Sequence, residues 1–175
     1  IAMSQSNDVM QRQQLHGKRA KQIQMIVFDF DGVFTDNRVL TMQDGTEAVF
    51  CWRGDGFGVA AVKSLGINVL VISTETNSVV SERCRKLEIP CIQACKDKKK
   101  ALKREVGKFG ISLECVAYMG NDINDLECLE MVGLPVCVAD AHPDVISASS
   151  YVTNKKGGYG AVREFCDYIV KLRAG

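Results

Sequence analysis

The sequence predicts an α/β fold: a parallel sheet with helices on both faces and a projecting β-hairpin. Short apolar runs alternate with segments of helical periodicity along most of the chain, which is typical of a parallel sheet covered on both faces. The first apolar run, residues 23–28, ends directly in acidic residues and a glycine. Asp44-Gly45 then lies between two segments rich in β-forming residues, as hairpin turns do.

The expected elements follow in chain order. A buried strand at residues 23–30 precedes the hairpin, a helix at 56–65 ends at Gly66, and a second buried strand covers 67–74. Further helices are expected at residues 78–87, 98–110 and 124–132, and further strands at 90–93, 115–120 and 135–139. Residues 1–22 are polar and predict a linker or an expression remnant, which leaves 23–175 as one domain.

Composition narrows the possible functions. The chain has 175 residues, 46% of them hydrophobic, which suits one well-buried domain. Its formal charge of +1 suggests neither a nucleic-acid nor a membrane partner, and no apolar run approaches the ~20 residues of a membrane span. We therefore expect a soluble intracellular protein with reduced thiols at most of its eight cysteines. Cys91 and Cys95 have a zinc-like spacing but lack further ligands nearby.

Two carboxylates follow the first expected strand. Asp29 and Asp31 stand two residues apart, and side chains at that spacing in an extended segment share a face. A pair of this kind also occurs in ordinary surface turns. Here it follows the apolar run MIVF, at the mouth of a buried strand, where an unpaired carboxylate is costly without a cation or hydrogen-bond donors. We therefore favour a metal site.

A second acidic cluster, GNDIND at residues 120–125, follows another apolar strand and precedes a helix. Asn and Asp commonly cap helix N-termini, and we expect one of these residues to do so. Asn121, Asp122, Asn124 and Asp125 exceed what a cap requires, however, and their oxygens suit a hard cation such as Mg²⁺. Because ligands bind at the carboxyl ends of parallel strands, the two acidic clusters are expected at one edge of the sheet.

A phosphate site is expected beside these acids. Ser73 and Thr74 end the strand VLVIST before a helix start, where hydroxyl and N–H groups hold anions; a simple helix cap is the equally supported alternative. Four lysines surround Asp97 at the start of the next helix, against the direction of the helix dipole. A solvated helix face is the first interpretation of these lysines. A nearby anion would, however, offset the cost of placing positive charges at the helix N-terminus, so one lysine is expected to point into the site.

In this order, the segments resemble the haloacid dehalogenase superfamily. DFDGV is similar to its first motif, Ser73 to its second, Lys98 to its third and GNDIND to its fourth. The hairpin after Gly32 and the terminal GGYGAVREFCDYIV resemble the branch that lacks a cap domain and acts on sugar-acid phosphates. Similarity runs from about Gln24 to Leu172. The resemblance implies a Rossmann-like fold without a cap domain.

The resemblance also implies a magnesium-dependent phosphatase that works through an aspartyl phosphate. Asp29 would be the nucleophile and Asp31 the acid/base partner, while Ser73 and Lys98 would hold the phosphate oxygens. The implied ligands of magnesium are Asp29, the carbonyl group of Asp31 and Asn121, with Asp122 and Asp125 as further candidates.

Two departures from the family pattern bear on substrate and metal. Glu75 stands where the octulosonate phosphatases typically carry Arg, and with Arg83 and Lys86 it resembles the specificity trio of phosphatases for nine-carbon, sialic-acid-type sugar acids. A solvated helix face is the alternative for Arg83 and Lys86. Asn121 stands where most relatives carry a magnesium-binding Asp, so weaker metal binding is expected.

The likeness extends to the C-terminal domain of the animal CMP-sialic acid synthetase family. It implies a small anionic sugar phosphate as ligand, a covalently linked N-terminal cytidylyltransferase domain, a nuclear location and a homotetramer formed through the hairpin. A largely non-catalytic tetramerisation module is the alternative function. The apolar side chains of residues 39–52 agree with assembly, because a lone two-stranded ribbon is only marginally stable in water.

Overall fold

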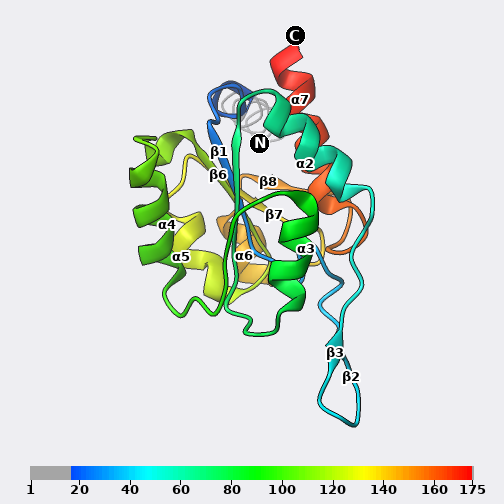
Figure 1. Cartoon of the computed structure of the whole chain (residues 1–175). Helices are drawn as coiled ribbons and strands as arrows, with labels where there is room; N and C mark the ends of the chain where they lie inside the picture. Colours follow the sequence, from blue (N-terminus) through cyan, green and yellow to red (C-terminus); the bar gives the residue numbers. More distant parts are fainter. Residues whose placement is uncertain (1–16, 175) are drawn as a thin grey trace, which may run out of the picture.

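The computed structural model describes residues 17–174 and consists of a parallel sheet between two layers of helices (Figure 1). The sheet order is β5-β4-β1-β6-β7-β8. Its strands are β1 (Met25–Phe28), β4 (Asn68–Ile72), β5 (Cys91–Ile92), β6 (Val116–Gly120), β7 (Leu134–Cys137) and β8 (Tyr151–Val152). The described structure confirms the α/β fold class.

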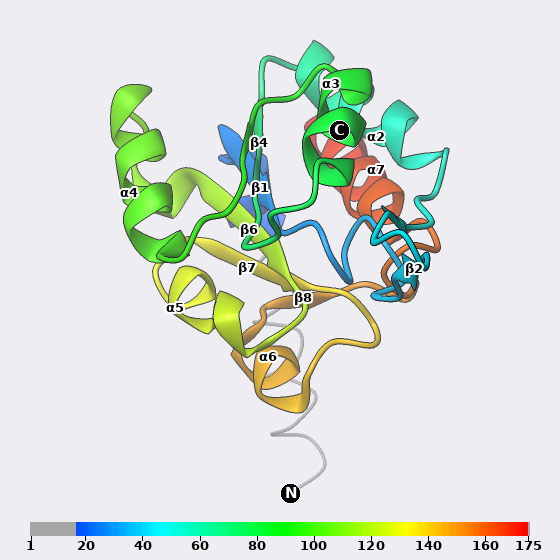
Figure 2. The ribbon, with the colours of Figure 1, turned by 60° about the horizontal axis from the view of Figure 1, so that its bottom comes forward.

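The helices form two groups. Figure 2 shows α2 (Asp55–Ser64), α3 (Val79–Leu87) and α7 (Ala161–Ala174) on one face of the sheet. The other face carries α4 (Lys98–Lys108), α5 (Leu126–Leu129) and α6 (Pro143–Ala148). None of the helices in residues 17–174 has the length and apolarity needed to cross a membrane.

β1 is the centre of the fold because the chain reverses its direction of winding there. All four of its residues are buried, as expected for an apolar run covered on both faces. Phe28 lies level with Val71 of β4 and with Met119 of β6. The residues that follow these three strands therefore meet at one edge of the sheet, at the switch point where α/β proteins bind ligands.

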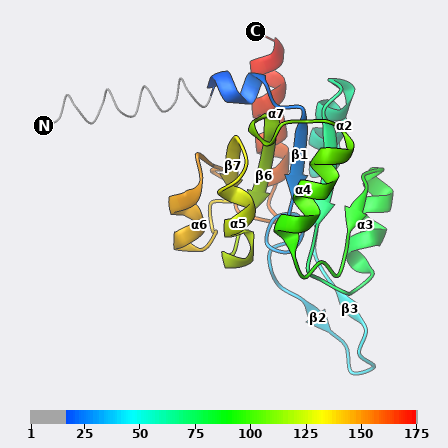
Figure 3. The ribbon, with the colours of Figure 1, turned by 90° about the vertical axis from the view of Figure 1, so that its left-hand side faces the viewer.

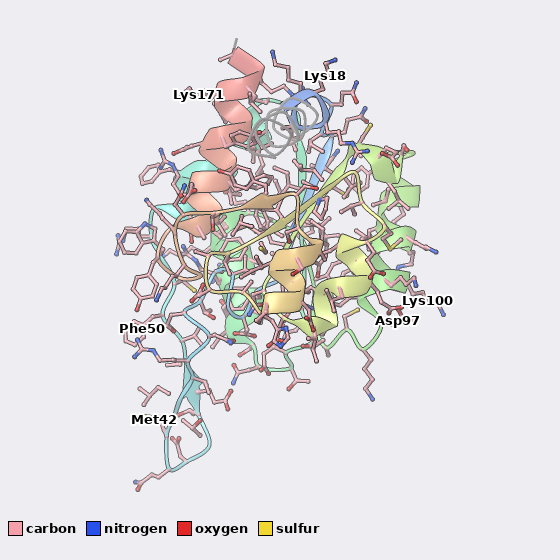
Figure 4. All side chains as sticks on the ribbon, turned by 180° about the vertical axis from the view of Figure 1, so that it is seen from behind. Lys18, Met42, Phe50, Asp97, Lys100 and Lys171 are labelled. Atoms are coloured by element: carbon pink, nitrogen blue, oxygen red, sulfur yellow. The ribbon has the colours of Figure 1, made fainter. Side chains whose placement is uncertain are left out.

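The expected hairpin is present and projects from this end of the molecule. β2 (Leu40–Thr41) and β3 (Glu47–Ala48) pair antiparallel around the turn at Asp44-Gly45. Figure 3 shows the ribbon extending away from the helices, at the end opposite the C-terminus. Figure 4 shows Met42 and Phe50 on this ribbon, outside the packed body.

Most expected elements are present, with differences at three places. The helix expected at 124–132 is a 3₁₀ turn at Ile123–Asp125 followed by the short α5, because Asp122 and Asp125 satisfy the helix start with their side chains. Helices α6 and α7 and strand β8 were not expected.

Residues 17–21 are helical, and Ala20 is fully buried. The packed region therefore begins before the expected boundary at residue 23, while residues 1–16 of the expected linker lie outside the described part. All eight cysteines are free thiols, as expected.

Candidate active site

Asp29 occupies the first position after β1 and is held by the neighbouring strand. Its backbone N–H donates to the Met119 carbonyl at 2.9 Å, so the β1–β6 pairing continues to the acid. The chain then turns: Gly32 has φ +77°, and a β-carbon there would collide with the Asn121 side chain. Only glycine both adopts this positive φ without strain and leaves space for the Asn121 side chain. The two sequence clusters are thus packed directly against each other.

Lys98 comes from the first turn of α4 and is the lysine that points into the site. It is buried, and its Nζ lies 2.8 Å from Asp29 Oδ1 and 2.8 Å from Asp125 Oδ1. Burial alone would lower the pKa of Lys98, but the two carboxylates outweigh it and raise the pKa. Burial and the charge of Asp125 raise the pKa of Asp29, while Lys98 opposes this. One ammonium group cannot neutralise the charge of two buried carboxylates. A further cation beside Asp29 would therefore be favourable.

The remaining lysines of this cluster are on the surface. Figure 4 labels Lys100 together with Asp97 at the start of α4, at the end of the molecule that carries the hairpin. Asp97 caps the helix by accepting a hydrogen bond from the Lys100 backbone N–H at 2.8 Å. The solvated-face interpretation is therefore correct for the exposed lysines, and the site interpretation is correct for Lys98.

Asn121 completes a set of groups that fits a hard divalent cation. One terminal atom of its amide lies 3.3 Å from Asp29 Oδ2 and 2.9 Å from the main-chain oxygen of Asp31. A nitrogen at this place donates to both oxygens. An oxygen at this place makes three oxygens converge, which requires a cation among them. Residues 17–174 contain no group of three His, Cys, Asp or Glu side chains arranged for a metal, so a cation bound here would need amide and carbonyl oxygens as ligands.

Asp31 is half-buried and faces the same cavity. Burial and the nearby charge of Glu75 raise the pKa of the Asp31 carboxyl, and a hydrogen bond from Thr35 opposes this. The cavity has a volume of about 270 Å³. It is lined by Asp29, Asp31, Asn37, Thr74, Asn121, Asp122, Ile123 and Asn124. A larger, mainly apolar hollow lies at the opposite edge of the sheet and contains none of the expected site residues.

Ser73 and Thr74 follow β4, beside Asp29 in the sheet. Ser73 is buried, and its Oγ accepts a hydrogen bond from the Glu75 backbone N–H at 3.1 Å. This hydroxyl stabilises the loop before α3 but is not a helix cap, because α3 begins at Val79 with Ser78 at its N-cap position. Thr74 is exposed and lines the cavity. Both residues thus lie at the predicted edge, and Thr74 is the one in the cavity wall.

Asp125 has a different position from the one expected of a metal ligand. It is fully buried; Oδ1 accepts from Lys98 and from Tyr118, and Oδ2 accepts from the backbone N–H of Asn121 at 2.9 Å. The Asp122 N–H adds a longer bond of 3.3 Å. These donors occupy both oxygens, so we correct its role to that of a support for Lys98. Asp122 caps the 3₁₀ turn and also lines the cavity.

The expected specificity trio is only partly brought together. Glu75 is close enough to Asp31 to affect its pKa, although its Oε1 also accepts from the Thr76 and Asn77 N–H groups. Arg83 and Lys86 line a separate groove of about 470 Å³ between α3 and the hairpin. Within one chain, that groove and the Asp29 cavity share no lining residue.

Sequence reasoning missed three residues that shape the site. Thr35 is fully buried and its Oγ1 accepts from the Gly32 and Asn37 N–H groups, which fixes the turn after Asp31. Gly157 touches the same turn: a β-carbon there would collide with the Gly32 carbonyl group. Tyr118 contacts Asp125 from the core. The sequence could have indicated Thr35, a polar residue four positions after Asp31. It gave no indication of Tyr118, which lies within an ordinary apolar strand.

Comparisons with known proteins agree with this arrangement. Residues 73–165 match the family model described as haloacid dehalogenase-like hydrolase. The chain is 37% identical to the 3-deoxy-D-manno-octulosonate 8-phosphate phosphatase of Salmonella typhi over 153 residues, covering 87% of this chain and 81% of that protein.

Solved structures give the same result. A putative hydrolase of this family from Streptomyces avermitilis is 47% identical, with a TM-score of 0.85 over 87% of this chain and 89% of that one. The 3-deoxy-D-manno-octulosonate 8-phosphate phosphatase of Moraxella catarrhalis, solved with magnesium, phosphate and the sugar acid, is 34% identical, with a TM-score of 0.88 over 91% and 92% of the two chains. With the acids, the lysine and the amide assembled at the switch point of the sheet, this chain belongs to the haloacid dehalogenase-like hydrolases.

Proposed function

We propose that this chain is a magnesium-dependent phosphatase that hydrolyses the phosphate ester of a 3-deoxy-2-keto sugar acid. The observation that carries the proposal is the surroundings of Asp29: Lys98 Nζ lies 2.8 Å from Oδ1, and the Asn121 amide lies 3.3 Å from Oδ2. A carboxylate held between a cation and a candidate metal position is placed for nucleophilic attack on phosphorus. The phosphatase relatives support both the reaction and the substrate class.

The residues have separate roles in two steps. An Asp29 oxygen forms a bond to phosphorus while the bond from phosphorus to the sugar oxygen breaks, and Asp31 donates its proton to that leaving oxygen. Water then attacks phosphorus, Asp31 accepts the water proton, and the Asp29–phosphorus bond breaks to release inorganic phosphate. Lys98 binds phosphoryl oxygens throughout. Magnesium, when bound by Asp29, the Asp31 carbonyl and Asn121, supplies positive charge to the phosphoryl group.

The raised pKa of Asp31 agrees with its role as the acid. A carboxyl group with an ordinary pKa is almost fully ionised at neutral pH and has no proton to donate. Burial and the Glu75 charge shift Asp31 toward the protonated form. The leaving sugar oxygen thus meets a group that holds a proton more often than an exposed aspartate does.

The finer substrate hypothesis concerns chain length. The named relatives act on an eight-carbon acid, whereas Glu75 together with Arg83 and Lys86 favours a nine-carbon, sialic-acid-type acid. Arg83 and Lys86 lie away from Asp29, so they suit the carboxylate at the far end of a long substrate. The synthetase parent, its N-terminal cytidylyltransferase domain and a nuclear location stay predictions, and the full-length reading frame is the test of that parent.

The test is phosphate release by the unaltered chain from eight-carbon and nine-carbon sugar-acid phosphates, with magnesium or with EDTA. We expect turnover only with magnesium, and Asp29→Asn should lower kcat by at least about a thousandfold because it removes the nucleophile. Asp167→Asn, which alters an exposed carboxylate paired with Arg163, is the matched control. Equal turnover in Asp29→Asn and the control would refute the mechanism, and the ratio of kcat/KM between the two acids decides the chain length.

A further inference from the structure

The fully buried side chain of Tyr118 is connected to Lys98 through a single residue, Asp125. Tyr118 belongs to β6, and its hydroxyl donates to Asp125 Oδ1 at 2.7 Å. The same oxygen accepts from Lys98 Nζ at 2.8 Å, and this Nζ lies 2.8 Å from Asp29 Oδ1. A continuous series of polar contacts therefore joins a hydroxyl in the core to the nucleophile.

Asp125 is held too firmly to move when one donor is lost. Its Oδ2 is bound by the backbone N–H groups of Asn121 and Asp122. A β-carbon at Gly120 would collide with the Asp125 side chain, so the backbone packs directly against it. Because Oδ2 is fixed in this way, a change at Oδ1 must be taken up by the groups that share it, which are the Tyr118 hydroxyl and Lys98.

Lys98 lies between two carboxylates that compete for it. Its distances to Asp29 Oδ1 and Asp125 Oδ1 are equal, and all three side chains are buried, where charge interactions are strong. The phenol hydrogen bond stabilises part of the negative charge on Asp125 and so weakens its attraction for the ammonium group. Without the hydroxyl, Asp125 would hold Lys98 more tightly, at the expense of the contact with Asp29 and with a bound phosphoryl group.

We propose that Tyr118 is a positioning residue of the phosphatase site, whose hydroxyl acts through Asp125 to balance Lys98 between Asp125 and the nucleophile. The proposal rests on the function proposed above and goes beyond it, since Tyr118 does not line the substrate cavity. Its effect reaches the reaction only through Lys98. It therefore changes the stabilisation of the phosphoryl group in the transition state more than it changes substrate binding.

The variant Tyr118→Phe keeps the ring in the core and removes only the hydroxyl. We expect kcat to fall about tenfold with KM changed less than about twofold, which is the scale of one hydrogen bond to a charged group. Orthovanadate, which mimics the phosphoryl group in transit, should lose affinity by about the same factor as kcat/KM. Tyr151→Phe is the matched control: Tyr151 is a half-buried tyrosine stacked on Tyr168, with ring centroids 4.6 Å apart, and should leave these constants unchanged.

A double-mutant cycle tests the route through Asp125. If Tyr118 acts through Asp125, adding Tyr118→Phe to Asp125→Asn should change kcat by less than about twofold. The same tenfold loss in both backgrounds would overturn the proposal, as would unchanged kinetics in Tyr118→Phe accompanied only by a lower melting temperature. Lys98→Ala provides a second background if Asp125→Asn does not fold.

The two proposals fail in different ways. No phosphate release by the unaltered chain would refute the proposed function. Calorimetric titration with orthovanadate and magnesium would still report on the position of Lys98, and equal affinities in the unaltered chain and Tyr118→Phe would refute the positioning role. Turnover by the unaltered chain that is unchanged in Tyr118→Phe would refute the positioning role alone.

Discussion

At the scale of single residues, Asn121 is the proposed magnesium ligand that carries no charge, where the family resemblance leads us to expect an Asp. The amide lies against Asp29 Oδ2 and the Asp31 carbonyl, which are the other two groups proposed to bind magnesium. It brings one neutral oxygen in place of a carboxylate. Because cation affinity rises with the charge of the ligands, the amide should weaken magnesium binding without abolishing it.

This reasoning predicts the effect of Asn121→Asp. The added negative charge should lower the magnesium concentration for half-maximal phosphate release by about tenfold. Without magnesium the variant should melt at a lower temperature than the unaltered chain, because a further carboxylate is then left uncompensated beside Asp29. Asn124→Asp, in the wall of the same cavity, is the control for a simple change in charge. A magnesium titration that gives the same midpoint for Asn121→Asp and the unaltered chain would show that Asn121 is not a ligand.

At the scale of elements, Asp55 joins two helices that cover the same face of the sheet. It is the first residue of α2, is fully buried, and accepts a hydrogen bond from the Arg163 N–H of α7 at 3.0 Å through Oδ1. Its Oδ2 has no hydrogen-bond partner in residues 17–174. Burial raises the pKa of Asp55 from 3.8 to about 7, against the opposing effects of the Arg163 hydrogen bond and the Arg83 charge.

A pKa that is higher in the folded state makes this contact pH-dependent. The stabilisation from protonated Asp55 is fully present below about pH 4 and is lost as the pH rises through about 7. Asp55→Asn cannot ionise and should lack this dependence. Urea denaturation of both proteins should therefore show that, between pH 4.5 and 7.5, the free energy of unfolding of the unaltered chain falls by roughly 3 kcal/mol relative to that of Asp55→Asn. A difference that is constant with pH would mean that Asp55 ionises normally in the fold.

At the scale of the whole molecule, the hairpin is the part that the single chain leaves without a packing partner. Leu40 and Phe50 expose 55% and 72% of their surface, and Val39, Met42 and Trp52 are also exposed. Two pairs of residues are too few to hold such a ribbon in water on their own. Association through this surface would cover it, and a closed homotetramer would leave no apolar edge exposed.

We accordingly predict that the unaltered chain is a homotetramer in solution. Leu40→Asp combined with Phe50→Asp should dissociate it to smaller species while leaving the helical circular dichroism largely unchanged, because neither side chain belongs to the buried core. Phe109→Asp is the control, since Phe109 is 55% exposed at the opposite end of the molecule. Light scattering that gives a monomer for the unaltered chain at micromolar concentration would refute the assembly and, with it, the tetramerisation alternative.

Most of the fold could be predicted from local sequence patterns. Residues 25–28, 68–72 and 116–120 are apolar runs whose burial depends on few distant details, so their strands and their parallel arrangement were predictable. The elements α6 and β8 were not predicted, because each is short and its sequence has weak periodicity. Helix α7 was missed although its apolar residues recur with helical spacing. The short α5 shows a similar limit: whether Asp125 begins a long helix or ends a 3₁₀ turn depends on its contacts with Tyr118 of the preceding strand and with Lys98, which comes from a distant part of the chain.

The sequence by itself determined which residues were candidates for the site. Asp29, Asp31 and Asn121 were singled out because acids and amides directly after buried strands are costly unless they serve a common ligand. The helix dipole indicated that one of four lysines points into the site, and the family resemblance indicated Lys98. Only the tertiary structure decided which of these side chains contact one another. It directed Asp125 away from the metal position and toward Lys98, left Arg83 and Lys86 in a separate groove, and brought Tyr118 into the network. Spacing along the chain shows which side chains share a face, whereas the partner of a buried polar atom depends on which distant elements pack against it.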